Sequence, residues 1–193
     1  MALTLDYTKR YTYADYLTWA DDKMRELFNG LVKLMSPAPA VIHQRASIRL
    51  GNALFKVVKR NKGKCEVFCA PFDVRLPKNN ETADDQIYTV VQPDICVICD
   101  LSKLDERGCL GAPDMIIEIQ SVSTAKYDLN DKFKIYEEAG VREYWVVFPY
   151  EKGILQFILQ DDGKYDQGAK YDIEKIPVHI FYGAEIDLND VFE

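Results

Sequence analysis

Two short, strongly apolar segments, Met115–Gln120 and Glu143–Phe148, constrain the fold of this chain more than any other feature. Each is six residues long, the first rich in Ile and the second in Val and aromatic residues, which predicts a β-strand. Between them an amphipathic pattern predicts a helix that begins at about Ser123 or Asp128 and ends at Ala139. A chain in which strands and helices alternate in this way folds as an α/β or α+β protein.

The first third of the chain predicts three further elements. Asn29-Gly30 is a strong hairpin turn signal between the apolar runs Met24–Phe28 and Leu31–Met35. A long amphipathic helix is expected from Val41 to Arg60. Thr12, with an acid three residues later, predicts a capped N-terminal helix. No repeat or linker divides the chain, so we expect one domain over residues 1–193, with a mixed sheet flanked by helices and a core at roughly 40–160.

Composition indicates a soluble, cytoplasmic protein. No apolar run approaches the roughly 18 residues that cross a bilayer, and the N-terminus lacks the basic start and apolar stretch of a signal peptide. The five cysteines are an odd number, and Cys96 and Cys99 would point to opposite faces of one strand. We therefore expect reduced thiols rather than a disulfide framework or a zinc site.

The charge distribution is asymmetric. The net charge is −7, which disfavours binding of nucleic acid by bulk charge. The segment Ala40–Cys65, however, has no acidic residue and seven basic ones. This block is either the solvated face of a helix or a local patch that faces phosphates. Its five helical members are the candidate contacts to a DNA backbone: Arg45, Arg49, Lys56, Lys59 and Arg60.

Two carboxylates lie within apolar strands, where acidic residues are rare. Glu118 shares one strand face with Gln120, and Asp94 follows Pro93 within the preceding predicted strand, Val90–Cys99. Burial of unpaired carboxylates costs several kcal/mol, and two neighbouring ones also repel each other. A bound Mg²⁺ or Mn²⁺ would offset both costs, because these ions prefer oxygen ligands. Alternatively, each acid reaches solvent or pairs with a lysine.

The order and spacing of these residues resemble the PD-(D/E)xK nuclease superfamily, and most closely its Uma2 branch, whose members are generally labelled candidate restriction endonucleases. The core of the resemblance is Pro93-Asp94, then 24 residues to Glu118, then a helix that carries Lys132. Further matching segments run along most of the chain: Arg25–Gly30, Ser36-Pro37, Phe72–Leu76, Gln92–Ile95, Ile116–Thr124 and Gly140–Val147.

The resemblance implies a restriction-endonuclease-like fold and Mg²⁺-dependent hydrolysis of DNA, with Mn²⁺ as a substitute ion. Asp94 and Glu118 would hold the metal together with the carbonyl of Ile119. The superfamily lysine is expected two residues after the second acid, where this chain has Gln120. Lys132 is then the migrated substitute, and Gln120 could orient water or a metal-bound ligand.

Several alternatives stay open at this stage. Lys126 and Lys134 compete with Lys132, which could also form only a surface ion pair with Asp128. The family positions further include Glu26, His43 and Asp73, which could act in the site or be structural. The expected partners are DNA and a second copy of the chain in a homodimer. The alternative functions are a catalytically inactive nucleic-acid-binding protein and a dimeric structural protein with the nuclease fold.

Overall fold

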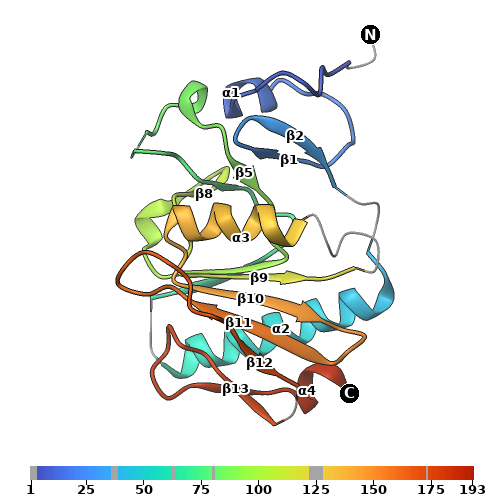
Figure 1. Ribbon diagram of the computed structural model, residues 1–193, viewed down its shortest axis with the longest axis vertical. Helices are drawn as coiled ribbons and strands as arrows, with labels where there is room; N and C mark the ends of the chain where they lie inside the picture. The colour runs from blue at the N-terminus through green and yellow to red at the C-terminus, as the bar shows by residue number, and fades with distance from the viewer. Residues whose placement is uncertain (1–3, 36–38, 62–63, 80, 122–127, 173) are drawn as a thin grey trace.

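A computed structural model describes residues 4–35, 39–61, 64–79, 81–121, 128–172 and 174–193. Within this part of the chain, the strands form two six-stranded sheets and a short two-stranded pair (Figure 1). We call the sheet with the longer strands the larger sheet and the other the smaller sheet. The larger sheet has the order β12-β11-β10-β9-β6-β3. Its strands are β3 (Glu66–Cys69), β6 (Ile95–Ile98), β9 (Met115–Ile119), β10 (Glu143–Phe148), β11 (Gly153–Ile158) and β12 (Ala169–Tyr171).

The two apolar segments that dominate the sequence are the adjacent central strands β9 and β10. They run parallel, with Glu143 opposite Met115 and Val147 opposite Ile119. Parallel neighbours need a crossover connection, and α3 (Asp128–Ala139) lies within it. The chain leaves α3 through Gly140, whose φ of +84° is the left-handed conformation expected of a residue that ends a helix.

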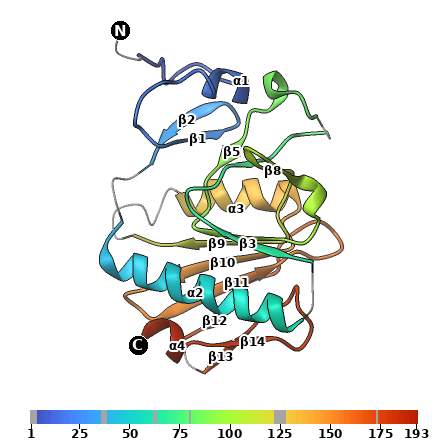
Figure 2. The ribbon, with the colours of Figure 1, turned by 180° about the vertical axis from the view of Figure 1, so that it is seen from behind.

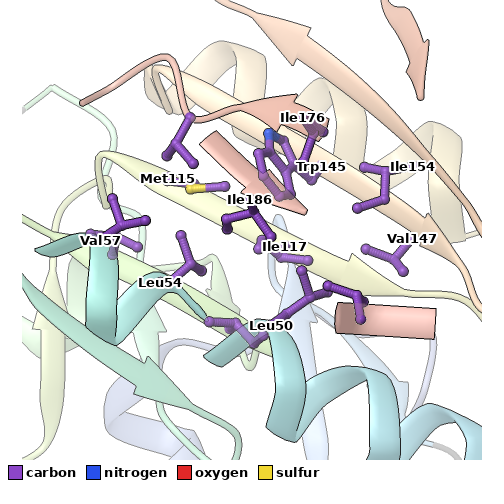
Figure 3. Packing of buried hydrophobic residues seen from close by; sticks show 14 of the residues in the cluster. Leu50, Leu54, Val57, Met115, Ile117, Trp145, Val147, Ile154, Ile176 and Ile186 are labelled. Atoms are coloured by element: carbon purple, nitrogen blue, oxygen red, sulfur yellow. The ribbon is translucent and has the colours of Figure 1, made fainter. Parts of the chain in front are cut away.

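Helix α2 (Val41–Arg60) covers one face of the larger sheet, and α3 covers the other (Figures 1 and 2). Figure 3 shows Leu50 and Leu54 of α2 packed near Ile117, with Trp145 and Ile176 in the same cluster. Each of these five side chains is fully buried. Full burial of an aliphatic side chain contributes roughly 1.5–3 kcal/mol, so this face supplies much of the folding free energy.

The smaller sheet lies on the far side of α3 from the larger one (Figure 1). Its order is β2-β1-β5-β4-β8-β7. Side chains of α3 pack with both sheets, because one buried cluster joins Phe28 and Val91 of the smaller sheet to Tyr136 and Ile116. The strands are β1 (Arg25–Phe28), β2 (Leu31–Leu34), β4 (Val74–Arg75), β5 (Val90–Val91), β7 (Leu104–Asp105) and β8 (Gly108–Leu110).

The N-terminal elements form as their sequence signals predict. Thr12 and Asp15 make the reciprocal capping hydrogen bonds at the start of α1 (Tyr13–Tyr16). Strands β1 and β2 form an antiparallel hairpin around Asn29 and Gly30, with φ of +50° and +86°. A side chain on Gly30 would collide with Arg10 and Tyr11, so glycine is required there for space as well as for its backbone conformation.

The C-terminal segment packs under α2. Ile176 and Ile186 join the same buried cluster as α2, and Arg49 donates hydrogen bonds to the backbone carbonyls of Val191 and Glu193. Among the described helices, none is long and apolar enough to cross a membrane. The remaining elements are η1 (Asp84–Gln86), η2 (Leu101–Lys103), β13 (Lys175–Pro177), β14 (Glu185–Asp187) and α4 (Asn189–Phe192).

The expectation that all five cysteines are reduced is wrong for one pair, because Cys65 and Cys99 form a disulfide. These residues flank β3 and β6, and the antiparallel register that sets Glu66 opposite Ile98 also sets Cys65 opposite Cys99. Spacing along the sequence does not reveal such a cross-strand pair. The other cysteines are free: Cys69 is exposed, whereas Cys96 and Cys109 are buried.

Candidate active site

Asp94 and Glu118 lie at the same end of two neighbouring strands inside the larger sheet, Asp94 just before β6 and Glu118 near the end of β9. Ile95 of β6 pairs with Ile117 of β9, and the same antiparallel register places Asp94 across from Glu118. The Asp94 carboxylate accepts a hydrogen bond from the backbone N–H of Ile119, with an N to Oδ2 distance of 2.8 Å. The pair of acids is therefore fixed by strand pairing and not by a flexible loop.

Glu118 points toward α3 and is buried, with an exposed fraction of 7%. Its Oε1 lies 2.9 Å from Nζ of Lys132 and accepts a 2.6 Å hydrogen bond from the hydroxyl of Tyr136. Lys132 and Tyr136 are four residues apart, so they lie on one face of α3. The lysine that the sequence proposes for catalysis is thus also the cation that pairs with the buried acid.

A third carboxylate, from the other sheet, completes this cluster. Glu26 of β1 is buried, and its Oε1 lies 3.0 Å from Nζ of Lys132. The same oxygen accepts a hydrogen bond from the backbone N–H of Gln92 at 2.9 Å. The Gln92 side-chain amide in turn donates to Oδ1 of Asp73 at 2.7 Å. One network therefore joins both sheets and α3 at the site.

Asp94 is the more open of the two strand acids, with 21% of its side chain exposed. Nε2 of His43, in the first turn of α2, lies 3.3 Å from its Oδ2. Burial of the ring opposes protonation, but the hydrogen bond and negative charge of Asp94 outweigh it and raise the pKa of His43 above its ordinary value. Because of this pairing, His43 carries a positive charge beside Asp94 over a wider pH range.

The cluster has an excess of negative charge. Burial raises the pKa of Glu118 to about 7, and the nearby Asp94 and Glu26 add to the effect, while Lys132 and Tyr136 oppose it. Burial also disfavours the Lys132 ammonium, but Glu118 and Glu26 outweigh burial and raise the pKa of Lys132. One ammonium therefore balances more than one buried carboxylate, and an additional cation would be bound favourably.

These shifts predict the pH dependence of stability in the metal-free protein. Glu118 and His43 both have raised pKa values in the folded state, so their favourable contributions are complete at low pH. Each contribution is lost as the pH rises through the folded-state pKa of its group. For Glu118 this pKa is about 7. The free energy of unfolding should therefore fall between pH 5 and 8, by on the order of 2 kcal/mol for Glu118. Urea unfolding at intervals of one pH unit measures this slope.

Glu118→Gln is the matched variant for that measurement. Glutamine has the same shape but does not ionise, so most of the decline between pH 5 and 8 should disappear in this variant. Parallel stability curves for wild type and Glu118→Gln would show that Glu118 is not the titrating group.

The structure places most of the sequence-predicted site residues together. Glu118, Lys132 and Glu26 are linked by direct contacts, and Asp73 joins them through Gln92. Asp94 and His43 form a second contacting pair, which the hydrogen bond from the Ile119 backbone N–H to Asp94 ties to the residue after Glu118. Among the rival lysines, Lys134 is exposed and Lys126 lies outside the described residues. The side chain of Asp128 is likewise undescribed, so its proposed ion pair with Lys132 is untested.

Two residues of the network were not predicted as site residues. Tyr136 contacts Glu118, and its position four residues after Lys132 is the signal that could have identified it. Gln92 contacts both Glu26 and Asp73, and its position two residues before Asp94 could have done so. The sequence places Tyr136 on the same helical face as Lys132 and Gln92 in a family-like segment, but it assigns neither of them a role in the site.

The predicted DNA-contact residues lie along α2, which leads away from the site. His43 is close to Asp94, but Arg60 is 17 residues further on, or ~25 Å at 1.5 Å per residue. Exposed Ile48 and Phe55 lie among the basic residues of the helix. The DNA-contact assignment therefore stays a prediction for this face: Arg45, Lys56, Lys59 and Arg60 are exposed, and Arg49 is half-buried.

The donor chemistry of the site fits a hard divalent cation. Asp94 and Glu118 supply carboxylate oxygens, and the buried Oε1 of Gln120 has no hydrogen-bond partner in the described part of the chain. Gln120 follows Glu118 by two residues, so strand alternation sets both on one face, and an unpartnered oxygen there suits Mg²⁺ or Mn²⁺. Among the described residues, no group of three or more His, Cys, Asp or Glu side chains has the geometry of a metal site. The cation that contacts Glu118 in the structure is the Lys132 ammonium.

A mixed sheet with α2 on one face and α3 on the other is the arrangement of the restriction-endonuclease-like class of nuclease folds. The chain belongs to the Uma2 family, whose model is described as "Putative restriction endonuclease" and matches residues 13–188.

Two known proteins resemble the chain over most of its length. "Uncharacterized protein slr1290" from Synechocystis is 25% identical over 152 residues, covering 77% of this chain and 74% of its own. The crystal structure of "a putative nuclease belonging to DUF820" from Anabaena variabilis superposes with a TM-score of 0.73. It is 19% identical, and the match covers 94% of this chain and 97% of that one. At this identity the likeness establishes the fold.

Proposed function

We propose that this protein is a metal-dependent endonuclease that hydrolyses phosphodiester bonds in DNA, with a variant PD-(D/E)xK site. The observation that carries the proposal is the position of Lys132. Its ammonium is buried and lies 2.9 Å from Glu118, on the helix that follows the second acid of the motif. Gln120 is neutral and cannot supply the positive charge of the superfamily lysine. Lys132, buried and in contact with Glu118, would supply that charge instead.

Each site residue has a distinct role in this proposal. Asp94 and Glu118 would hold Mg²⁺, with the carbonyl of Ile119 and with Gln120 as a further oxygen donor. When bound, the ion lowers the pKa of a coordinated water and neutralises charge on the phosphoryl oxygens. Lys132 would donate a hydrogen bond to those oxygens or to the attacking water, an effect worth on the order of 10²-fold in rate.

Features around the site complete the proposal. His43, held by Asp94 at the start of α2, would present a positive charge toward the phosphate that enters the site. The basic residues further along α2 would add sequence-independent contacts to the DNA backbone. A homodimer and a cytoplasmic location belong to the same proposal.

Incubation of plasmid and oligonucleotide DNA with the protein and Mg²⁺ or Mn²⁺ tests it. We expect metal-dependent cleavage that Glu118→Ala abolishes and that Glu143→Gln, a buried acid elsewhere in the larger sheet, retains. No cleavage of any single- or double-stranded substrate with either ion, or equal cleavage by Glu118→Ala, would contradict the proposal.

One observation favours a second candidate, a nucleic-acid-binding protein that kept the fold without activity. The position of the superfamily lysine is occupied by Gln120, which is neutral. Such a protein would bind DNA with strong salt dependence and cleave none of it. A dimeric structural protein would show no DNA affinity even at low salt, so one binding and cleavage series separates the three functions.

A further inference from the structure

We infer that Glu26 is a positioning residue that keeps Lys132 in the site when Glu118 binds a metal ion. The inference rests on the proposed function, because it takes Asp94 and Glu118 as the metal ligands. It goes beyond that function in assigning a role to an acid from the smaller sheet, which belongs to neither of the motif strands.

The Lys132 ammonium is shared between two carboxylates. Its Nζ lies 2.9 Å from Oε1 of Glu118 and 3.0 Å from Oε1 of Glu26. The exposed fraction of each of the three side chains is 10% or less. Neither ion pair is therefore weakened by water, and the ammonium is bound about equally on both sides.

A metal ion at Glu118 must compete with Lys132. The Glu118 oxygen nearest the ammonium also accepts the hydrogen bond from Tyr136, so this oxygen is already occupied. Binding of a divalent cation there would repel the ammonium and weaken its contact with Glu118. A buried ammonium that loses its counter-ion is strongly destabilised, so metal binding would be opposed unless a second acid retains Lys132.

Glu26 is held where it can retain the ammonium. It lies on the paired strand β1, and its Oε1 accepts the backbone N–H of Gln92, two residues before Asp94. This hydrogen bond ties Glu26 to the segment that carries the first metal ligand. When a metal ion displaces Lys132 from Glu118, the ammonium can therefore stay in the site, paired with Glu26 alone.

The direct test is a double-mutant cycle on metal affinity. Isothermal titration calorimetry would measure the Mn²⁺ dissociation constant of wild type, Glu26→Gln, Lys132→Met and the double variant. Glu26→Gln keeps the shape of the side chain and an oxygen that accepts from Gln92, so it changes charge alone. We expect it to weaken Mn²⁺ binding about tenfold, within the range of couplings between contacting residues.

The two other members of the cycle distinguish positioning from direct ligation. Lys132→Met removes the competing ammonium and should tighten Mn²⁺ binding. In that background Glu26→Gln should have almost no further effect, because Glu26 acts through Lys132. Glu143→Gln is the matched control: it neutralises another buried acid in the folded core and should leave Mn²⁺ affinity unchanged.

A spectroscopic measurement keeps the test decisive if Lys132→Met does not fold. In protein labelled with ¹⁵N-lysine, the buried Lys132 ammonium should give a protected NMR signal, assigned by its loss in Lys132→Arg. The signal should survive saturation with Mg²⁺ in wild type and broaden under the same conditions in Glu26→Gln.

The outcomes separate this inference from the proposed function. Equal weakening by Glu26→Gln in both backgrounds would make Glu26 a metal ligand and overturn the positioning role. Unchanged Mn²⁺ affinity in Glu26→Gln would overturn it as well, and a wild type that binds no Mn²⁺ would overturn it together with the metal site. Absence of DNA cleavage while the cycle behaves as expected would overturn the proposed function alone.

Discussion

Asparagine in place of Asp94 should remove most of the stabilisation that Mn²⁺ gives to the folded protein, and should lower DNA cleavage by about a thousandfold or more. A ligand that binds only the folded state at a hundredfold excess over its dissociation constant stabilises it by about 2.7 kcal/mol. Wild type should show this shift in thermal melts with Mn²⁺. Asp94→Asn and Glu118→Gln should show much less, since each has lost a ligand.

The metal-free melts provide the control for this prediction. Glu118→Gln leaves Lys132 paired with Glu26 and removes a buried like charge, so it should be as stable as wild type at pH 8 or more stable. Reduced Mn²⁺ shifts cannot then be ascribed to damaged folding. Equal Mn²⁺ shifts in all three proteins would contradict the metal site.

Lys132→Met should lower the free energy of unfolding of the metal-free protein by about 3–5 kcal/mol, the usual result of removing one partner from a buried ion pair. The variant leaves two buried carboxylates, Glu118 and Glu26, without the ammonium that both contact. Urea unfolding at pH 8, above the pKa of about 7 of Glu118 in the wild type, would measure the loss.

Lys134→Met is the matched control for this prediction, because Lys134 lies on the same helix and is exposed. It should change stability by less than about 0.5 kcal/mol. Addition of Glu26→Gln to Lys132→Met should restore part of the loss, since it removes one of the uncompensated charges. A loss no larger for Lys132→Met than for Lys134→Met would show that Lys132 is not a buried counter-ion.

The sequence predicts the elements whose signals are local. The bounds of α2 and β10 and the turn at Asn29-Gly30 follow from hydrophobic periodicity and turn chemistry, and all three are confirmed. The sequence also predicts a bent strand or a strand pair over Cys65–Leu76 and a strand over Val90–Cys99 that Pro93 interrupts. It does not predict that each of these segments divides between the two sheets. Val74–Arg75 and Val90–Val91 are only two residues long and become strands because distant segments pair with them. The disulfide between Cys65 and Cys99 could not be predicted for the same reason, because it depends on the pairing of β3 with β6.

The site likewise has residues that the sequence identifies and contacts that only the folded structure reveals. Family resemblance identifies Asp94, Glu118 and Lys132, and the register of β6 with β9 brings the two acids together. It does not reveal that Lys132 is shared with Glu26, because the two residues are far apart in the sequence and meet only when the two sheets pack on α3. A contact of this kind depends on tertiary structure, and no spacing rule within one helix or strand describes it.

The position of α3 between the two sheets would separate loss of the proposed activity from loss of the fold. The larger sheet keeps its main apolar core with α2, on the face away from α3. Proteins open in parts at lower free energies than they unfold, and we expect the contact between α3 and the β1–β2 hairpin to be such a part. A molecule opened there would keep Asp94 beside Glu118 but release Lys132 from Glu26. Warming would then inactivate the protein reversibly, well below the temperature at which its core melts.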